Sequence, residues 1–335
     1  MTEKQARRKR ILSGMRPTGR LHLGNLVGAL ANWRDLQDEY ECFFMSADYH
    51  ALMSEYEKPA AIADNVREVV TDFLACGLDP KRSVLFRQSD VPEHAELHLI
   101  LSAYTPISWL ERNPTYKEQM QQLTNRDIHN YAFLGYPVLQ AADIVLYKAD
   151  LVPVGEDQLP HLELTREVVR RFNSLLGRDI LVEPQAKLTA SPRLLGTDRR
   201  KMSKSYGNQI DIADPPDVIR TKVMTMITDP KRVYRADPGH PEECNVCQYY
   251  KTFSPGEYDD VARKCAGATW GCKDCKGRLA DVLIEYLAEP RARRAELEAD
   301  PGRVVAVLAD GARRAQAVAR ATLDEVKEAT GLKAL

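Results

Sequence analysis

The chain has 335 residues, and its 47 Lys and Arg residues almost balance its 48 Asp and Glu residues. The composition, 44% hydrophobic and 28% charged, excludes a disordered chain, and the net charge of −1 excludes a protein that binds nucleic acid through overall positive charge. No run of about 20 apolar residues is present, so we exclude a transmembrane helix. The basic N-terminus lacks the apolar segment of a signal peptide, so we expect no export, and the length favours two domains.

Strands and helices alternate in the first half of the chain. Short apolar runs at residues 11–15, 42–48 and 83–88 predict buried strands. Residues 58–76 carry apolar side chains at helical spacing and predict a helix that ends before Asp79-Pro80. Such alternation predicts a parallel sheet with helices on its faces, in which ligands bind at the carboxyl ends of the strands.

The second half of the chain, from about residue 208, is mainly helical. Pro215-Pro216 opens one expected helix. Residues 229–277 are rich in turn residues and cysteines, so we expect little regular structure there. Two Ala-, Arg- and Leu-rich helices follow, at 278–298 and 302–330.

A glycine-rich segment, RPTGRLHLGNLVGAL, covers residues 16–30 directly after the first expected strand. A strand-to-helix turn of this kind exposes backbone N–H groups, which attract phosphate together with the helix dipole. Gly19 and Gly24 permit close backbone approach, and His22 and Asn25 can donate hydrogen bonds to a nucleotide. The alternative is a turn that only packs a helix against the sheet.

A second motif, KMSKS, occupies residues 201–205. Lys201 and Lys204 lie in a short polar loop and can hold a polyphosphate whose negative charge grows in a transition state. The alternative is a solvated basic loop, which the presence of the upstream glycine-rich segment disfavours.

The two motifs together resemble the signatures of class I aminoacyl-tRNA synthetases, since LHLGN resembles the HIGH signature and KMSKS matches its partner letter for letter. Within this class the chain resembles the tryptophanyl-tRNA synthetases over nearly its whole length. Four blocks carry the resemblance: SGMRPTGRLHLGN (13–25), SADYH (46–50), YPVLQAADIVLY (136–147) and VGEDQLPHLELTR (154–166). The related tyrosyl-tRNA synthetases do not usually carry the last block.

The resemblance implies a two-step reaction. The carboxylate of L-tryptophan attacks the α-phosphate of ATP, and the tryptophanyl group then passes to the 3′-terminal ribose of tRNA(Trp). Mg²⁺ bound with ATP, a cytoplasmic location, a homodimer and no membrane partner are also implied. The expected fold is α/β, with a Rossmann-type parallel-sheet catalytic domain (1–207), a mainly helical anticodon-binding domain (208–298) and a C-terminal helix that returns to the catalytic domain (299–335).

By the same resemblance, Asp143 binds the indole N–H of tryptophan, because a carboxylate only accepts hydrogen bonds and the indole nitrogen only donates. Phenylalanine would leave that carboxylate unpaired. A surface position for Asp143 is disfavoured by its apolar neighbours in the sequence. Gln140 stands where many bacterial members have methionine, and it either accepts a second hydrogen bond from the indole or contacts the backbone of the amino acid. The other expected tryptophan-site residues are Gly14, His50, Tyr136, Val152, Val154 and Gln158.

The resemblance also assigns an ATP site, whose catalytic members are His22, Asn25, Lys201 and Lys204. Lys117 maps onto a further phosphate-binding lysine, with a helix-surface position as an equal alternative. Arg16 stands where the family usually has glutamine. The remaining expected ATP-binding residues are Thr18, Gly24, Gly155, Asp157 and Ser203.

Five of the seven cysteines lie within 244–275, which favours a metal site in a protein that is not exported. One grouping, Cys244-x2-Cys247 with Cys272-x2-Cys275, is typical of a structural zinc site. The other resembles the subset of tryptophanyl-tRNA synthetases with a [4Fe–4S] cluster, and its ligands would be Cys244, Cys265, Cys272 and Cys275, with Cys247 as the spare. The short separation of Cys244 from Cys265 leaves the choice between Cys244 and Cys247 open. The remaining pair, Cys42 and Cys76, is expected in the core.

Basic residues near the cysteines either contact tRNA phosphates or form a solvated helical face. They are Arg220, Lys222, Lys231, Arg232 and Arg235. Two other functions are weighed against tryptophan activation: a tyrosyl-type enzyme, and a synthetase-like protein that binds a partner or senses redox state. An intact KMSKS motif and Asp143 disfavour the second.

Overall fold

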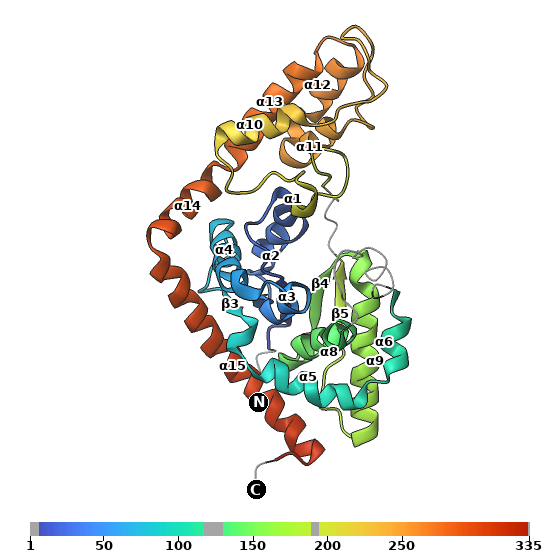
Figure 1. Ribbon diagram of the computed structural model, residues 1–335, viewed down its shortest axis with the longest axis vertical. Coiled ribbons are helices and arrows are strands. Elements are labelled where there is room, and N and C mark those ends of the chain that lie inside the picture. The colour runs from blue at the N-terminus through green and yellow to red at the C-terminus, as the bar shows by residue number, and fades with distance from the viewer. Residues whose placement is uncertain (1–6, 115, 117–129, 189–193, 334–335) are drawn as a thin grey trace, which may run out of the picture.

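The computed structural model describes residues 7–114, 116, 130–188 and 194–333. Its centre is a five-stranded parallel sheet with the strand order β3-β2-β1-β4-β5 (Figure 1). The strands are β1 Arg10–Met15, β2 Glu41–Ser46, β3 Ser83–Arg87, β4 Leu151–Val154 and β5 Gln185–Leu188. The parallel α/β fold and the first three strands are therefore confirmed.

The strand order produces a divergence between β1 and β4. The chain runs outward from β1 to β2 and β3, and then crosses to the opposite side of β1 for β4 and β5. In open parallel sheets, ligands bind at the carboxyl ends of the strands where the connections diverge in this way. These two strands and the segments that leave them carry more than half of the residues expected to bind tryptophan and ATP.

Two buried apolar clusters cover the two faces of the sheet, because successive side chains of a strand point to opposite sides. Along β2, Cys42 and Phe44 belong to one cluster, whereas Phe43 and Met45 belong to the other. The helices that pack on these faces are amphipathic or buried throughout.

The helices have the following bounds. In the first part they are α1 Leu23–Asn25, a π-helix Leu26–Leu30, α2 Ala31–Leu36, α3 Asp48–Glu55, α4 Ile62–Ala75, α5 Glu93–Tyr104, α6 Ile107–Arg112, α8 Tyr131–Leu146 and α9 Leu159–Leu176. In the second part they are α10 Pro216–Thr225, α11 Asn245–Phe253, α12 Pro255–Ala266, α13 Cys272–Tyr286, α14 Ala288–Ala299 and α15 Pro301–Thr330. Short 3₁₀ turns occur at Pro59–Ala61, Gln88–Asp90, Glu156–Gln158 and Lys204–Tyr206. No helix among the described residues is long and apolar enough to span a membrane.

The π-helix joins α1 to α2 without a break, so that a single helical run follows the glycine-rich turn. Leu26 and Leu30 are buried in the apolar cluster on one face of the sheet. A π-helical turn has a wider ring of hydrogen bonds than an α-helical turn, and such turns are frequent at functional sites.

The segment 229–277 is more regular than we expected, since it contains α11, α12 and the start of α13. In α11, Val246, Tyr249, Tyr250 and Phe253 are buried at helical spacing, a signal that the turn residues and cysteines around it obscured. The helix expected at 278–298 is divided into α13 and α14. Pro290 explains the break, because its missing N–H cannot bond to the carbonyl four residues earlier.

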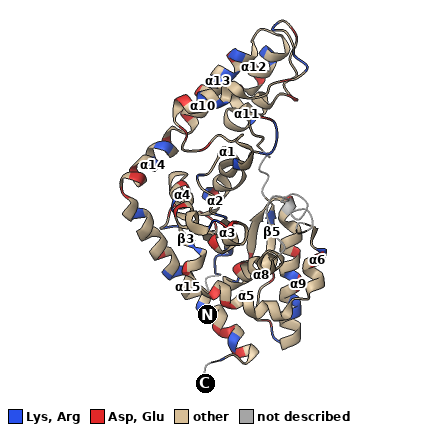
Figure 2. Ribbon diagram, in the orientation of Figure 1, with Lys and Arg blue, Asp and Glu red and all other residues tan. Residues whose placement is uncertain are grey.

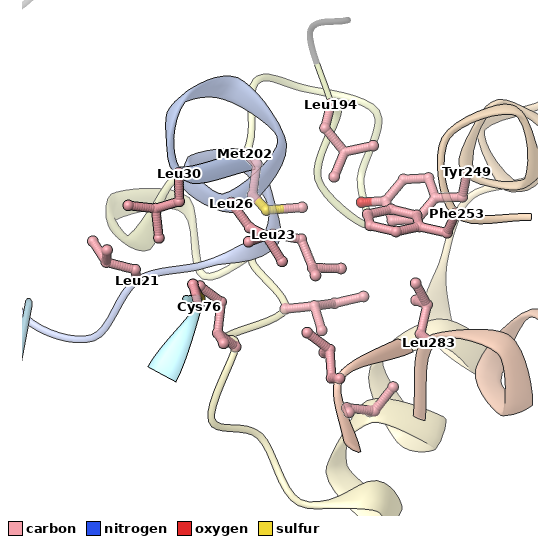
Figure 3. Close-up of a cluster of buried hydrophobic side chains, with 14 of the residues drawn as sticks. Leu21, Leu23, Leu26, Leu30, Cys76, Leu194, Met202, Tyr249, Phe253 and Leu283 are labelled. Carbon is pink, nitrogen blue, oxygen red and sulfur yellow. The ribbon is translucent and has the colours of Figure 1, made fainter. Parts of the chain in front are cut away.

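The helices α10–α13 gather at one end of the molecule, and the apolar cluster of the first part continues into them without interruption (Figure 1). Figure 3 shows Leu23 and Leu26 from the turn after β1, Met202 from the KMSKS loop, and Tyr249 and Leu283 from α11 and α13 in one cluster. The two parts of the chain therefore share a core, and a division near residue 207 remains a proposal.

The last helix, α15, packs along β3, which is an edge strand of the sheet. Gly311 permits the contact, because an added Cβ atom would lie 1.8 Å from the carbonyl oxygen of Leu85. Arg314 Nη1 donates a hydrogen bond of 2.7 Å to the carbonyl of Pro80. The helix thus covers an edge that would otherwise be exposed to other chains.

Replacing Gly311 with alanine should force α15 away from β3. We expect Gly311→Ala to lower the free energy of unfolding by about 1–3 kcal/mol, the usual cost of overpacking a core. Urea unfolding followed by circular dichroism would measure it.

The matched control is Gly277→Ala in α13, where an added Cβ meets nothing within 4 Å. This variant should gain about 0.5–1 kcal/mol, because alanine is the better helix former. Equal stabilities for the two variants would contradict the packing explanation.

Candidate active site

A cavity of about 430 Å³ opens at the carboxyl ends of β1, β2 and β4. All eight residues expected for tryptophan line it: Gly14, His50, Tyr136, Gln140, Asp143, Val152, Val154 and Gln158. They come from two strands, the helices α3 and α8, and the turn after β4. Gly14 has to be small here, because an added Cβ would lie 2.7 Å from the Met45 side chain.

Asp143 is fully buried at the wall of this cavity and binds three side chains. Its Oδ1 atom lies 2.6 Å from His94 Nδ1 and 2.8 Å from Gln88 Nε2. Its Oδ2 atom lies 2.8 Å from His50 Nε2. Each carboxylate oxygen has two lone pairs, so Oδ2 can accept a further hydrogen bond from a ligand.

These contacts determine the charge of the Asp143 carboxyl group. Burial on its own would raise its pKa, but the hydrogen bonds from His50 and His94 lower the pKa from 3.8 to about 2. The group is therefore a carboxylate at neutral pH. The stability it contributes is present above pH 3.8 and is lost as the pH falls through about 2.

Sequence reasoning identified His50 but missed Gln88 and His94, the other two residues that hold Asp143. Gln88 directly follows β3, and its place at the carboxyl end of a parallel strand is a signal that could have identified it. His94, near the start of α5, carried no comparable signal. Its Nε2 atom lies 2.8 Å from the hydroxyl of Tyr147, so the buried contacts continue beyond Asp143.

Tyr136 lines the same cavity and is held by His161, which also lines it. The Tyr136 hydroxyl lies 3.0 Å from His161 Nε2, and His161 Nδ1 lies 3.2 Å from Asn113 Nδ2. Burial raises the pKa of Tyr136, so its hydroxyl is neutral and can donate or accept a hydrogen bond.

The glycine-rich turn is fixed by hydrogen bonds between His22 and Asn25. Asn25 N–H donates to His22 Nδ1 at 3.3 Å, and His22 N–H donates to Asn25 Oδ1 at 3.1 Å. Burial, together with the charges of Lys204 and Lys201, lowers the pKa of His22 from 6.5 to about 4. His22 is therefore neutral at pH 7, and because Nδ1 accepts a hydrogen bond, the ring proton resides on Nε2.

The KMSKS loop lies against this turn at two points. Lys204 Nζ donates to the carbonyl of Thr18 at 2.9 Å, and Gly24 N–H donates to Met202 Sδ at 3.4 Å. Asn208 holds the loop from behind. It accepts from Ser203 N–H at 2.8 Å and donates to the Lys201 carbonyl at 3.1 Å.

The expected ATP-binding residues thus fall into three sets. Arg16 and Gly155 line the cavity of Asp143. Thr18, His22, Gly24, Asn25, Lys201, Ser203 and Lys204 belong to the adjoining turn and loop. Asp157 lies in the 3₁₀ turn Glu156–Gln158, but its side chain is outside the described residues, as is the whole of Lys117.

The five clustered cysteines line one small cavity among α11, α12 and α13. Cys247, the expected spare, faces the same cavity as the other four. Hydrogen bonding and burial raise the pKa of Cys244, and burial raises that of Cys265. Among the described residues, no three His, Cys, Asp or Glu side chains stand in an arrangement that could hold a metal ion.

The remaining cysteines behave as expected for core residues. Cys42 and Cys76 are both buried in the apolar cluster that joins the two parts of the chain. Burial raises the pKa of Cys42 from 9.0 to about 12.

The basic side chains near the cysteines are engaged within the protein. Arg220 pairs with Asp281, Lys222 with Asp214 at 2.6 Å, and Lys231 with Glu243 at 2.6 Å. Arg235 lies 3.6 Å from Asp274, and Arg232 donates to the carbonyl of Trp270. Both signs of charge occur along α10, α12 and α13 (Figure 2). This arrangement favours the solvated face over a continuous phosphate-binding patch.

Comparison with known proteins agrees with this geometry. The family described as tRNA synthetases class I (W and Y) matches residues 4–288. A tryptophan–tRNA ligase of Thermotoga maritima is 48% identical over 96% of this chain and 99% of the relative, and one of Ralstonia nicotianae is 42% identical over 97% and 98%. The crystal structure of a Campylobacter jejuni tryptophanyl-tRNA synthetase complexed with ADP and tryptophan superposes with a TM-score of 0.87 at 32% identity, over 96% of this chain and 99% of that one. The chain therefore belongs to the class I tRNA synthetases for tryptophan and tyrosine, and within that class to the tryptophanyl-tRNA synthetases.

The state of His22 can be tested by titration. NMR of the imidazole Cε1 proton should give a pKa of about 4, below the ordinary value of 6.5. Between these two values the unfolded chain binds the proton and the folded chain does not. The contribution of His22 to stability therefore falls as the pH drops from 6.5 toward 4.

The variant Lys204→Met should raise the pKa of His22, because the charge of Lys204 helps to lower it. Lys251→Met, on an exposed helix face of the second part, is the control and should leave the titration unchanged. A His22 pKa near 6.5 in the parent protein would contradict the assignment of a buried neutral imidazole.

Proposed function

We propose that the chain ligates L-tryptophan to tRNA(Trp), with tryptophan in the cavity of Asp143 and ATP between that cavity and the turn at His22. The observation that carries the proposal is the buried Asp143, which stays ionised at the wall of a cavity lined also by Val152 and Val154. An acceptor held in this way suits the indole N–H. Tyr136 and Gln158 line the same cavity and would hold the ammonium group.

In the first step, a carboxylate oxygen of tryptophan attacks the α-phosphorus of ATP, and the bond from that phosphorus to the bridging oxygen breaks. Tryptophanyl-adenylate forms and pyrophosphate leaves. In the second step, the terminal ribose hydroxyl of tRNA(Trp) takes the acyl group and AMP is released. The protein supplies position and charge to both steps rather than covalent chemistry.

The residues of the turn and the KMSKS loop would act on the phosphates. His22 can donate from Nε2–H without becoming charged, because its Nδ1 atom accepts from Asn25 N–H. Lys204 would exchange the Thr18 carbonyl for a phosphate oxygen, and together with Lys201 it would neutralise the departing pyrophosphate. Mg²⁺ carried by ATP would screen the same phosphates.

The other expected ATP contacts have supporting roles in this proposal. Gly24 permits close approach at the start of the helical run, and Ser203 shapes the loop that carries the lysines. Arg16 and Gly155 line the cavity where the ribose and α-phosphate would lie. Thr18, Asp157 and Lys117 stay assigned to ATP by the family pattern alone.

The role of Asp143 can be tested by ATP–pyrophosphate exchange. We expect exchange with tryptophan and not with tyrosine, and we expect Asp143→Asn to lower kcat/KM for tryptophan by about 100-fold or more. An amide would place a donor opposite either the indole or the histidines.

The control Asp281→Asn removes an exposed carboxylate outside the cavity and should leave exchange unchanged. Exchange with tyrosine alone would overturn the proposal in favour of a tyrosyl-type enzyme. Unchanged tryptophan kinetics in a folded Asp143→Asn variant would contradict the assignment of Asp143 to tryptophan binding.

For the cysteines we propose a thiolate-held metal group, either a [4Fe–4S] cluster or a structural zinc ion. The support is chemical, because five soft sulfur donors face one small cavity. Their side chains do not converge on one point in this structure, so metal binding would require the thiols to turn toward one another. Cys244, Cys265, Cys272 and Cys275 are the proposed ligands, and Cys247 is the alternative to Cys244. Bound metal would link α11, α12 and α13 to one another, and it would take no part in the reaction.

Metal analysis of protein purified without oxygen tests this proposal. A [4Fe–4S] cluster predicts brown protein with iron and acid-labile sulfide, which Cys272→Ser should lose and the core variant Cys42→Ser should keep. Stoichiometric zinc in colourless protein would assign the zinc alternative. Absence of both metals would show that the cysteines form only a buried thiol cluster.

The homodimer and the cytoplasmic location that the resemblance implies remain predictions. Light scattering of the purified protein should give twice the mass of one chain.

A further inference from the structure

A cluster of buried charges connects α14 to the turn that carries His22. Arg294 on α14 is 3% exposed, and its guanidinium group donates to the side chains of Asp72 and Glu68 on α4. Its Nε atom donates to Glu298 at 2.9 Å. A buried arginine is tolerated only when its donors are paired in this way, because an unpaired buried charge is costly.

Asp72 also bonds to the glycine-rich turn, so that it connects Arg294 to this turn. The carboxylate is fully buried, and while Oδ1 accepts from Arg294, Oδ2 accepts from the backbone N–H of Leu21 at 2.7 Å. Leu21 immediately precedes His22. The position of the backbone at the start of the glycine-rich turn is therefore set by a carboxylate whose own position is set by Arg294.

The same residues also bond to the chain that follows the KMSKS loop. Ile212 N–H donates to the Leu21 carbonyl at 2.9 Å, and Leu23 N–H donates to the Ile210 carbonyl at 2.9 Å. The backbone of Leu21–Leu23 is thus held both by Asp72 and by residues 210–212. A small displacement of Asp72 would move His22 relative to Lys204, and with it the site assigned to the phosphates.

Arg294 lies on the helix that connects the helical end of the molecule to the catalytic half. α14 connects α13, in the helical end of the molecule, to α15, which packs on β3, and α14 itself packs against α4 (Figure 1). The guanidinium group is thus a buried polar contact between this connecting helix and the catalytic half.

We propose that Asp72 and Arg294 are positioning residues for the ATP site, because the pair fixes the backbone of Leu21 and His22 from the connecting helix α14. The inference rests on the proposed function, since it assigns ATP phosphates to the His22 turn. Neither residue lines the substrate cavity, so the pair acts through the turn and not by contact with a substrate.

The experiment compares KM for ATP with KM for tryptophan in pyrophosphate exchange, using Asp72→Asn, Arg294→Gln and Arg294→Lys. We expect the first two variants to raise KM for ATP about tenfold and to leave KM for tryptophan within about twofold, because they misplace the phosphate turn and not the indole cavity. Arg294→Lys keeps the charge and should recover part of the loss.

The matched control is Arg293→Gln on the same helix, which removes an exposed pair with Glu289 and should change neither constant. Where Arg294→Gln does not fold, the double variant Asp72→Asn with Arg294→Gln provides the test, because it leaves neither member of the central pair charged. Parental KM values for ATP in folded variants would overturn the inference, as would equal rises in both constants.

An error in the proposed function can be distinguished from an error in the positioning inference by the variant Lys204→Met. If Lys204→Met left exchange intact, the assignment of the phosphates to the turn and loop would be wrong irrespective of Arg294. If Lys204→Met abolished exchange while the Asp72 and Arg294 variants matched the parent protein, only the positioning inference would be wrong.

Discussion

The organisation of this molecule depends on a short backbone ladder between Leu21–Leu23 and Ile210–Ile212. The first segment leaves the central strand of the sheet, and the second leads from the KMSKS loop into the helical end. Two backbone hydrogen bonds therefore hold together the turn, the lysine loop and the two parts of the chain. The apolar cluster around Leu23, Met202 and Tyr249 excludes water from this junction, which strengthens the hydrogen bonds that it surrounds (Figure 3).

The two buried titratable groups of the site have different charge states: Asp143 in the cavity is ionised, whereas His22 in the turn is neutral. In the cavity, histidines keep Asp143 ionised, so that a buried negative charge faces a ligand that can donate. In the turn, burial and lysine charges keep His22 neutral, so that in the proposed function a donor would face phosphate without adding a buried charge. Histidine would thus donate to a carboxylate in one place and bind phosphate as a neutral group in the other.

The sequence predicted those features that depend on a local pattern of residues, namely strands and motif-borne site residues. Apolar runs identified β1, β2 and β3, and the family blocks contain seven of the eight residues that the cavity brings together. Long-range contacts of polar side chains were not predictable. The bonds from His94 and Gln88 to Asp143 span 49 and 55 residues, and Arg294 reaches Asp72 across 222 residues. Such pairs depend on how helices pack, which no spacing within a segment reveals. α11 was missed for a different reason, because the turn residues and cysteines around it obscured the helical spacing of its buried side chains.

The π-helix between α1 and α2 has a consequence for register. One wide turn at Leu26–Leu30 accommodates an extra residue without ending the helical run, so every side chain beyond it is rotated by about 100° from where an uninterrupted α-helix would place it. That rotation decides which side chains of α2 meet the sheet: Asn32 and Trp33 reach the cavity, whereas Arg34 and Asp35 remain exposed. The extra residue in the π-helix thus contributes to the shape of the cavity, because it determines which side chains of α2 line it.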